Sequence, residues 1–264
     1  MQLNDFFQSI PKRFEPLFET SDNLWNILDN LKDFIQHTIK PNLPECIIPG
    51  VPLPDHVVLL PNGWLDEGFH VVCNAQTKGR LQVWIEGEPV PEASLLCAGS
   101  FFADSNIEIG LGVVVEPNTV IKGPAIIGDM SEVRHGAYIR GDSIFCKKCV
   151  IGHTTEVKHS IFLDNAKAGH FAYLGDSILG SNVNLGAGTK LANLQFATGS
   201  VVVNIKGKII DTKRRKLGAI LGDDVQTGCN SVINPGSFLA RGCLVAPTVS
   251  VRPGFYSPGT FIRG

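Results

Sequence analysis

A hydrophobic residue recurs at every sixth position through the middle of the chain. The unbroken run has nine members: Ile109, Val115, Ile121, Ile127, Val133, Ile139, Phe145, Ile151 and Val157. A helix repeats about every 3.6 residues and a strand every two residues, so neither explains a strict period of six. A triangular solenoid does explain it, because three six-residue strands complete one coil of eighteen residues. We therefore expect a parallel β-helix in which these large side chains point into the prism.

Small residues support this interpretation. Two positions before the later members of the run stand the following side chains: Thr119, Ala125, Ser131, Ala137, Ser143, Cys149 and Thr155. A small side chain fits near the tight corner of such a coil. The repeat resumes further on, loosely at first, at these positions: Leu179, Leu185, Leu191, Ile233, Leu239, Val245 and Val251.

Two segments interrupt the repeat. Its phase slips over residues 163–174, where we expect the backbone to bulge or bend. The pattern is lost over residues 195–217, where two short β runs flank Lys206 and Gly207. This pattern predicts a hairpin that leaves the wall of the solenoid. Insertions into a solenoid often map to its binding face.

The first 95 residues differ in kind and predict a small α+β cap domain, followed by the β-helix over residues 96–264. Ser21 is the expected N-cap of a helix that ends before Pro41. The apolar face of this helix comprises Leu24, Ile27, Leu28, Leu31, Phe34 and Ile35. Short strands are expected at residues 56–60, 69–73 and 81–85. We expect the cap to close the open end of the β-helix or to mediate assembly.

Composition restricts the functional classes. The 264 residues carry a formal net charge of −2, which gives no indication of nucleic-acid or membrane binding. No apolar run is long enough to span a bilayer, and the N-terminus does not resemble a secretory signal. The seven cysteines are odd in number and do not have the density of a disulfide scaffold, so we expect the protein to reside in a reducing cytoplasm. Cys146 and Cys149 form a lone C-x-x-C pair; because Cys149 falls on a small corner position, we expect packing and no metal.

An eighteen-residue spacing places side chains on neighbouring coils, about 4.8 Å apart. Three cations obey it: Lys122, Arg140 and Lys158. Each directly follows an inward aliphatic residue, so all three start from the same corner. Such a column suits a phosphate group, for which arginine offers a two-pronged donor. Cations on a surface can equally be solvated without a ligand, so the spacing leaves both interpretations open.

Histidines lie beside this column. His153, His159 and His170 fall in the neighbouring coils, and His170 lies in the segment where the phase slips. It is followed by a phenol, Tyr173, and by a Gly-rich stretch with several amides, 182–189. These groups are the ones needed to remove a proton from a bound nucleophile.

The stretch AGHFAYLGDSILGSNVNLGAGTKLANL closely resembles the acetyltransferase half of the bifunctional enzymes that make UDP-N-acetylglucosamine. It looks especially like archaeal-type sugar-1-phosphate nucleotidyltransferase/acetyltransferases, which also carry a KGK…RRKLGAIxGD segment like residues 206–223. The resemblance covers about residues 105 to 252. It implies a left-handed β-helix, a homotrimer, and acetylation of an amino-sugar 1-phosphate by acetyl-CoA. It leaves open the choice between glucosamine and galactosamine phosphates, and between acetyl and a longer acyl group.

The resemblance also implies roles for individual residues. His170 matches the general base that takes a proton from the sugar amine. Arg140 and Lys158 match residues that hold the sugar phosphate, and Tyr173 and Asn184 match sugar-contacting positions. The positions that match the acetyl-CoA site are Ala187, Asn193, Leu194 and Cys229.

Two departures from the family pattern are visible. Gly199 stands where the family has a lysine six residues after Asn193, and Lys206 or Lys208 are the nearest replacements in sequence. The nucleotidyltransferase half, with its Gly-rich phosphate loop, has no counterpart in residues 1–95. We therefore expect the chain to transfer acetyl groups without making a sugar nucleotide, and to depend on a separate nucleotidyltransferase protein for that step.

Two alternatives remain. A γ-type carbonic anhydrase has the same architecture, and residues 139–142 resemble part of it. However, its zinc site needs a His-x4-His spacing, and five residues separate His153 from His159. A non-catalytic β-helix scaffold that binds a partner is the second alternative.

Overall fold

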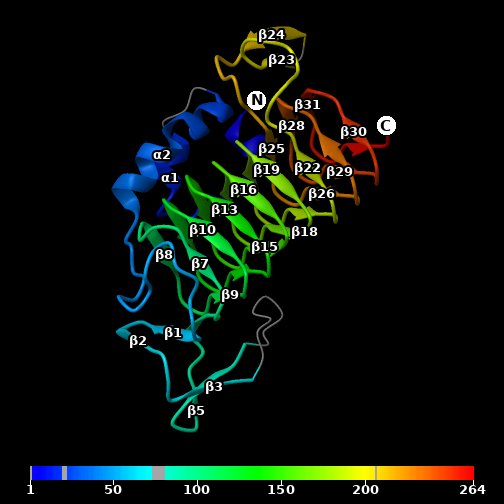
Figure 1. Cartoon of the computed structure of the whole chain (residues 1–264). Coiled ribbons are helices and arrows are strands. Elements are labelled where there is room, and N and C mark those ends of the chain that lie inside the picture. Colours follow the sequence, from blue (N-terminus) through cyan, green and yellow to red (C-terminus); the bar gives the residue numbers. More distant parts are fainter. Residues whose placement is uncertain (1, 20–22, 73–80, 206) are drawn as a thin grey trace.

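The structure is a computed structural model that describes residues 2–19, 23–72, 81–205 and 207–264. Over these residues the chain forms a mainly β solenoid of about nine turns, with a helical content of 9%. Successive coils stack in parallel along one axis (Figure 1). The β-helix predicted from the six-residue period is therefore confirmed.

Three sheets form the walls of the prism in the described part of the chain, and we number the faces in the order in which the chain visits them. Face I consists of β6 (Ser94–Leu96), β9 (Val114–Val115), β12 (Glu132–Val133), β15 (Val150–His153), β18 (Lys167–His170), β21 (Asn184–Leu185), β26 (Gln226–Thr227), β29 (Leu244–Val245) and β32 (Phe261–Ile262). Face II consists of β7 (Phe101–Phe102), β10 (Val120–Lys122), β13 (Tyr138–Arg140), β16 (Glu156–Lys158), β19 (Tyr173–Gly175), β22 (Lys190–Leu191), β27 (Val232–Ile233) and β30 (Ser250–Val251). Face III consists of β8 (Ile107–Ile109), β11 (Ala125–Ile127), β14 (Ser143–Phe145), β17 (Ile161–Phe162), β20 (Ile178–Leu179), β25 (Ala219–Leu221), β28 (Ser237–Leu239) and β31 (Gly254–Tyr256).

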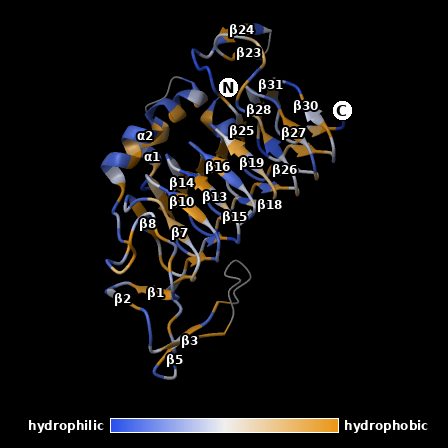
Figure 2. Ribbon diagram, viewed as in Figure 1, coloured by the Kyte–Doolittle hydropathy of each residue, from blue (hydrophilic) through white to orange (hydrophobic). Residues whose placement is uncertain are grey.

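The interior of the prism is built from the repeat. All nine aliphatic or aromatic residues of the unbroken run are buried and belong to one core cluster. The small residues two positions earlier are buried as well, which agrees with their expected place near the corners. Figure 2 shows the hydrophobic residues concentrated in the strands of the solenoid. Each coil therefore contributes one large side chain per face to a continuous core.

The phase slip has a different cause from the expected bulge. Val157 pairs with Leu174, seventeen residues later, whereas Ile139 pairs with Val157, eighteen residues later. The missing residue lies earlier than expected, at the corner between faces II and III that contains His159. The strands from 161 to 174 continue in regular parallel register, so the expectation of a bulge there was wrong. The next coil is also shortened at this corner, where Asp176 lies.

The hairpin prediction is confirmed. Strand β23 (Val202–Ile205) pairs antiparallel with β24 (Lys208–Asp211), and Gly207 in the turn has a positive φ of 83°. The hairpin leaves the solenoid at the same corner between faces II and III, one coil after the two shortened corners. Three consecutive coils are therefore irregular at one edge of the prism.

Face III carries a second apolar stripe on the outer side of its described strands. Its strands place two apolar residues next to each other, as in Ile126–Ile127, and one of each pair points outward. The outward residues stack in register: Ile126, Ile144, Ile161, Ile178, Ile220, Phe238 and Phe255. Because exposed apolar area of this size is unfavourable, the face needs a cover.

The N-terminal segment supplies that cover. It contains η1 (Leu3–Asp5), α1 (Glu15–Glu19), η2 (Leu24–Asn26) and α2 (Ile27–Thr38), which run beside the solenoid in Figure 1. Phe6 packs against Phe255 of the last coils, and Arg13 pairs with Glu108 near the first coils. The side chains Leu28, Leu31 and Ile35 are fully buried in this interface. The segment therefore crosses face III from its C-terminal to its N-terminal end.

The predicted helix is found with a later start. Helix α2 begins at Ile27 after an N-cap at Asn26, and Leu24 belongs to the preceding 3-10 turn. Ser21, the expected cap, lies outside the described residues. The apolar face is buried as predicted, with Phe34 only partly buried. Figure 2 shows hydrophilic and hydrophobic stretches side by side along this helix.

Residues 41–72 and 81–93 lie next to the first coil. Strand β1 (Val57–Leu60) pairs antiparallel with β6 and with β2 (Gly63–Leu65), and thereby extends face I. A small sheet of β3 (Phe69–Val71), β4 (Val83–Ile85) and β5 (Glu88–Pro89) lies beyond it. The side chains of Leu53, Val57 and Leu59 join the core of the prism. These contacts fit the expected role of closing one end. The three predicted strands are present in shortened form, and Cys73 lies outside the described residues.

None of the helices in the described ranges has the length and apolarity needed to cross a lipid bilayer.

The repeat predicts that a substitution at an inward position lowers the free energy of unfolding more than a substitution at a corner position. Ile151→Ala removes a fully buried side chain and should lower the free energy of unfolding by about 2–5 kcal/mol. Cys149→Ser introduces a serine at a corner position, where Ser131 and Ser143 already stand in other coils. Its hydroxyl can still donate a hydrogen bond to the Leu163 carbonyl, as the thiol does. This substitution should cost less than about 1.5 kcal/mol. Urea unfolding followed by circular dichroism measures both; equal losses would contradict the assignment of the two positions.

Candidate functional site

The predicted column of cations lies at the outer edge of face II. Lys122 pairs directly with Arg140 across β10 and β13, and Lys158 ends the next strand, β16. Opposite Lys158 on the following strand stands Gly175, so the column ends there. The structure therefore brings together the side chains that the eighteen-residue spacing predicts.

Neighbouring groups reduce the repulsion between these cations. The ammonium of Lys122 lies 5.6 Å from the centre of the Tyr138 ring, and the guanidinium of Arg140 lies 6.0 Å from it. Arg140 Nη1 donates a 2.7 Å hydrogen bond to Glu156 Oε1, and this bond raises the pKa of Arg140. Both partners are partly exposed, so an arriving phosphate can compete for the same guanidinium.

Tyr173 lies next to Glu156 in the sheet register. Its hydroxyl donates to Asn193 Oδ1 at 3.3 Å. Burial, followed by the nearby charges of Glu156 and Asp176, raises the pKa of the phenol above its usual value. The group therefore stays protonated at neutral pH and acts as a hydrogen-bond donor.

Asp176 completes this part of the site and was not predicted. It is 3% exposed, and its Oδ2 accepts a 2.5 Å hydrogen bond from Asn193 Nδ2. Lys158 Nζ lies 3.9 Å from the same oxygen. The sequence offers one hint, because an acidic residue also stands at the equivalent corner of another coil. The shortened coil moves Asp176 out of the eighteen-residue register, so the spacing rule does not connect the two positions.

His170 lies at the corner between faces I and II. It is the last residue of β18, it is exposed, and it pairs in register with His153. The ring of His153 stacks on that of His135, with 5.6 Å between centroids and 19° between planes. Three imidazoles thus occupy successive coils at one corner, and Tyr173 follows His170 by three residues. The predicted base and the phenol therefore lie in the same coil.

Lys190 holds the backbone around His170. Its ammonium donates to the carbonyls of Phe171 at 2.9 Å and Gly188 at 2.7 Å. The N–H of Gly188 in turn donates to the carbonyl of His170 at 2.9 Å. This cation was also not predicted, because the eighteen-residue rule does not place it in the Lys122 column.

The corner of His170 continues into two predicted acetyl-CoA positions. Strands β18, β21 and β26 pair in register, which places Ala187 and Cys229 at the same corner in the next two coils. The N–H of Asn230 donates to the Ala187 carbonyl at 2.8 Å, and Cys229 is exposed. These two positions therefore lie in line with His170 along one corner of the prism.

The remaining predicted residues lie elsewhere. Asn184 is exposed on face I, opposite Lys167, and thus projects from a different face than Tyr173. Asn193 is buried, and both ends of its amide are bonded within the chain. Leu194 is half exposed and lines a pocket of about 360 Å³ with the following side chains: Ala192, Gln195, Phe196, Val232, Asn234, Pro235 and Pro253. Gly199 adopts a positive φ of 97° with open space around it.

The histidines of the zinc-based alternative do not converge. His153 faces the corner between faces I and II, whereas His159 lies at the corner between faces II and III. His159 Nε2 donates to the Leu28 carbonyl at 2.8 Å. Within the described residues, no group of three or more His, Cys, Asp or Glu side chains is arranged to hold a metal ion.

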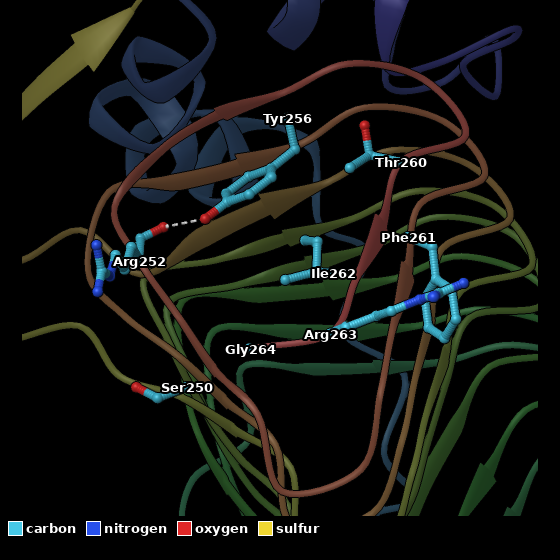
Figure 3. A pocket seen from close by; sticks show the side chains of 8 residues that line it. All are labelled: Ser250, Arg252, Tyr256, Thr260, Phe261, Ile262, Arg263 and Gly264. Atoms are coloured by element: carbon cyan, nitrogen blue, oxygen red, sulfur yellow. Dashed lines mark hydrogen bonds between the residues drawn. The ribbon is translucent and has the colours of Figure 1, made fainter.

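A pocket of about 450 Å³ lies against the last coil (Figure 3). The Tyr256 hydroxyl donates to the Arg252 carbonyl at 3.0 Å, and the Arg263 guanidinium lies 4.6 Å from the centre of the Phe261 ring. Its described lining comes from residues 250–264 and shares no side chain with the predicted site.

Comparison with known proteins supports the resemblance on independent grounds. Residues 121–241 match the family model of the GMPPB C-terminal domain. The chain is 42% identical over 140 residues to the bifunctional sugar-1-phosphate nucleotidylyltransferase/acetyltransferase of Sulfurisphaera tokodaii, covering 46% of this chain and 35% of that protein. It is 44% identical over 146 residues to the bifunctional protein GlmU of Methanococcus maripaludis, covering 53% and 35%. The GlmU of Methanocaldococcus jannaschii is 42% identical over 149 residues, covering 50% and 36%.

The chain thus spans about a third of the length of the curated relatives it matches. The predicted resemblance to these sugar-phosphate enzymes is confirmed over the hexapeptide-repeat part of the chain. Helix α2 and the remainder of the N-terminal segment lie outside the residues that match the family model.

The site geometry predicts that Gly175 cannot carry a side chain. A Cβ there would lie 2.4 Å from Asn193 Nδ2 and 2.8 Å from the Tyr173 hydroxyl. Gly175→Ala should therefore lower the free energy of unfolding by about 1–3 kcal/mol. Gly169→Ala, one strand away and beside His170, meets nothing within 4 Å and should change it by less than about 0.5 kcal/mol. Urea unfolding of both variants measures the difference, and equal stabilities would contradict the close packing of Tyr173 and Asn193.

Proposed function

We propose that the protein is an N-acetyltransferase that uses acetyl-CoA to acetylate an amino-sugar 1-phosphate, with glucosamine 1-phosphate as the first candidate. The coarser statement, similarity to transferases of the amino-sugar pathway, rests on the comparisons. One geometric observation carries the finer proposal. Arg140 and Lys158 end adjacent strands of face II, while His170 lies at the corner where face II begins, in line with Ala187 and Cys229.

The phosphate is the first group to be recognised. Arg140 can turn its guanidinium from Glu156 towards a phosphate that lies within reach of Lys158. Because adjacent strands lie about 4.8 Å apart, the two cations start close enough together for both to donate to oxygens of one phosphate group. The protonated phenol of Tyr173 lies between this anion and the corner of His170. Its proton is donated to Asn193, so its oxygen is available to accept a hydrogen bond from a sugar hydroxyl.

The chemical step is a direct acyl transfer. The imidazole of His170 accepts a proton from the sugar amine as its nitrogen forms a bond to the thioester carbonyl carbon. Amide N–H donors at the glycine-rich corner can stabilise the resulting oxyanion. The C–S bond then breaks, and the thiolate of CoA takes up the proton from the imidazolium.

Acetyl-CoA would lie along the coils that follow His170. Ala187 and Cys229 line the corner, and Cys229 is exposed there. The apolar pocket beside Leu194 and Phe196 suits the pantetheine arm, since ligand sites are mostly apolar. The amide of Asn193 acts through Tyr173 in this proposal, because both of its ends already have protein partners.

The proposal includes a homotrimer, which the positions of the proposed sugar-contacting residues support. Asn184 projects from face I, whereas Arg140 and Tyr173 project from face II. A sugar between two neighbouring prisms could be reached from face II of one copy and from face I of the next. A closed cyclic assembly gives every copy the same arrangement.

The proposal predicts release of CoA thiol from acetyl-CoA in the presence of glucosamine 1-phosphate. His170→Ala should lower kcat by about 10²–10⁴-fold, because it removes the base. Glucosamine without phosphate should react poorly, since it cannot occupy the two cations. A parallel assay with galactosamine 1-phosphate determines which of the two hexosamine phosphates is the substrate.

The matched control is His135→Ala, which removes an exposed imidazole from the same corner two coils earlier. It should keep wild-type activity. Absence of thiol release with every amino-sugar phosphate, or full activity in His170→Ala, would contradict the proposal and favour the scaffold alternative.

A further inference from the structure

A buried carboxylate lies where the three irregular coils meet. Asp176 is 3% exposed at the corner between faces II and III. Four side chains surround it: Lys158, His159, Asn193 and Arg214. Because burying an unpaired carboxylate costs several kcal/mol, a group in this position requires its partners.

The two oxygens of this carboxylate face different parts of the molecule. Oδ2 accepts from Asn193 Nδ2 at 2.5 Å and lies 3.9 Å from Lys158 Nζ. Lys158 ends β16 of face II, Asn193 follows β22 of the same face, and both belong to the candidate site. Oδ1 lies 3.6 Å from His159 Nδ1 and 3.6 Å from Arg214 Nη2. These two partners are not among the side chains that we propose to contact the substrate.

The partners of Oδ1 lead to the N-terminal helix. His159 Nε2 donates to the Leu28 carbonyl at 2.8 Å. Arg214 Nη1 donates to Asp29 Oδ1, and the arginine side chain is 11% exposed. Arg214 follows the hairpin in sequence, so α2 and the hairpin insertion both reach the same carboxylate.

The partners of Oδ2 determine the position of Tyr173. An amide has a donor end and an acceptor end. Because the Asn193 NH₂ group faces Asp176, its carbonyl oxygen must face the Tyr173 hydroxyl, which donates to it. Without the carboxylate, the amide could rotate and present NH₂ to the phenol, and Lys158 would lose its nearest anion.

We infer that Asp176 is a positioning residue that orients Asn193, Tyr173 and Lys158 for the amino-sugar phosphate, and that α2 holds Asp176 in place through His159 and Arg214. This inference rests on the proposed function. It assigns the N-terminal segment a role in a site whose substrate-facing side chains all come from the solenoid. Helix α2 is thus a support for substrate binding as well as a cover for face III.

Asp176→Asn tests the first half of the inference, since it keeps the shape and removes the charge. The KM for glucosamine 1-phosphate should rise and kcat/KM for this substrate should fall by about 10²-fold, as expected for misplaced binding groups. The KM for acetyl-CoA should stay at the wild-type value. A merely structural defect would lower the active fraction, and hence kcat, without changing one KM selectively.

Asp29→Asn tests the second half at an exposed position, where folding is not at risk. This substitution weakens the ion pair with Arg214. It should raise the KM for glucosamine 1-phosphate by a smaller factor, about 3- to 10-fold. Asp33→Asn, one turn further along α2 and also exposed, is the matched control and should behave as wild type.

The outcomes separate the two claims. An active wild type together with an unchanged KM for the sugar phosphate in Asp176→Asn would overturn the inference and leave the proposed function standing. A wild type that releases no thiol would overturn both. If Asp176→Asn fails to fold, Asp29→Asn decides: a KM equal to that of Asp33→Asn would overturn the coupling to α2.

Discussion

Hydrogen bonding between successive coils is the constraint on which the rest of the structure depends. Each strand pairs in parallel with its counterpart one coil away, so every outward side chain lies about 4.8 Å from its equivalents. The spacing of two residues in the sequence therefore determines whether their side chains lie next to each other. On face II this rule aligns Lys122, Arg140 and Lys158; at the adjoining corner it aligns His153 with His170. Regular pairing therefore assembles a binding surface from residues that are far apart in the chain.

The same constraint explains how much the sequence could predict. The six-residue period predicted the fold and the core, and its multiple of eighteen predicted the cations, because both depend only on register. The hairpin at 195–217 was predicted from local turn chemistry. Asp176 and Lys190 were missed for physical reasons. The shortened corners at His159 and Asp176 move later residues out of the eighteen-residue register, and the burial of Asp176 is completed by α2 and Arg214, which are remote in sequence.

Irregularity is concentrated at one edge of the prism. The corner between faces II and III is shortened in two coils and carries the hairpin in the third. Face III beside it is apolar outside as well as inside, and the doublet Ile126–Ile127 is the sequence signal for this. The N-terminal segment covers that face, and its helix meets the hairpin and the buried carboxylate at the irregular edge. A few side chains therefore connect the apolar packing on face III with the polar groups of the candidate site on face II.

The position of the sugar phosphate is the central claim, and a crystal structure with glucosamine 1-phosphate and CoA tests it most directly. We expect a phosphate within hydrogen-bonding distance of Arg140 and Lys158, with the amine of the sugar facing His170. A sugar phosphate bound at any other place, such as the pocket near Arg252 and Arg263, with both cations of face II unliganded, would contradict it.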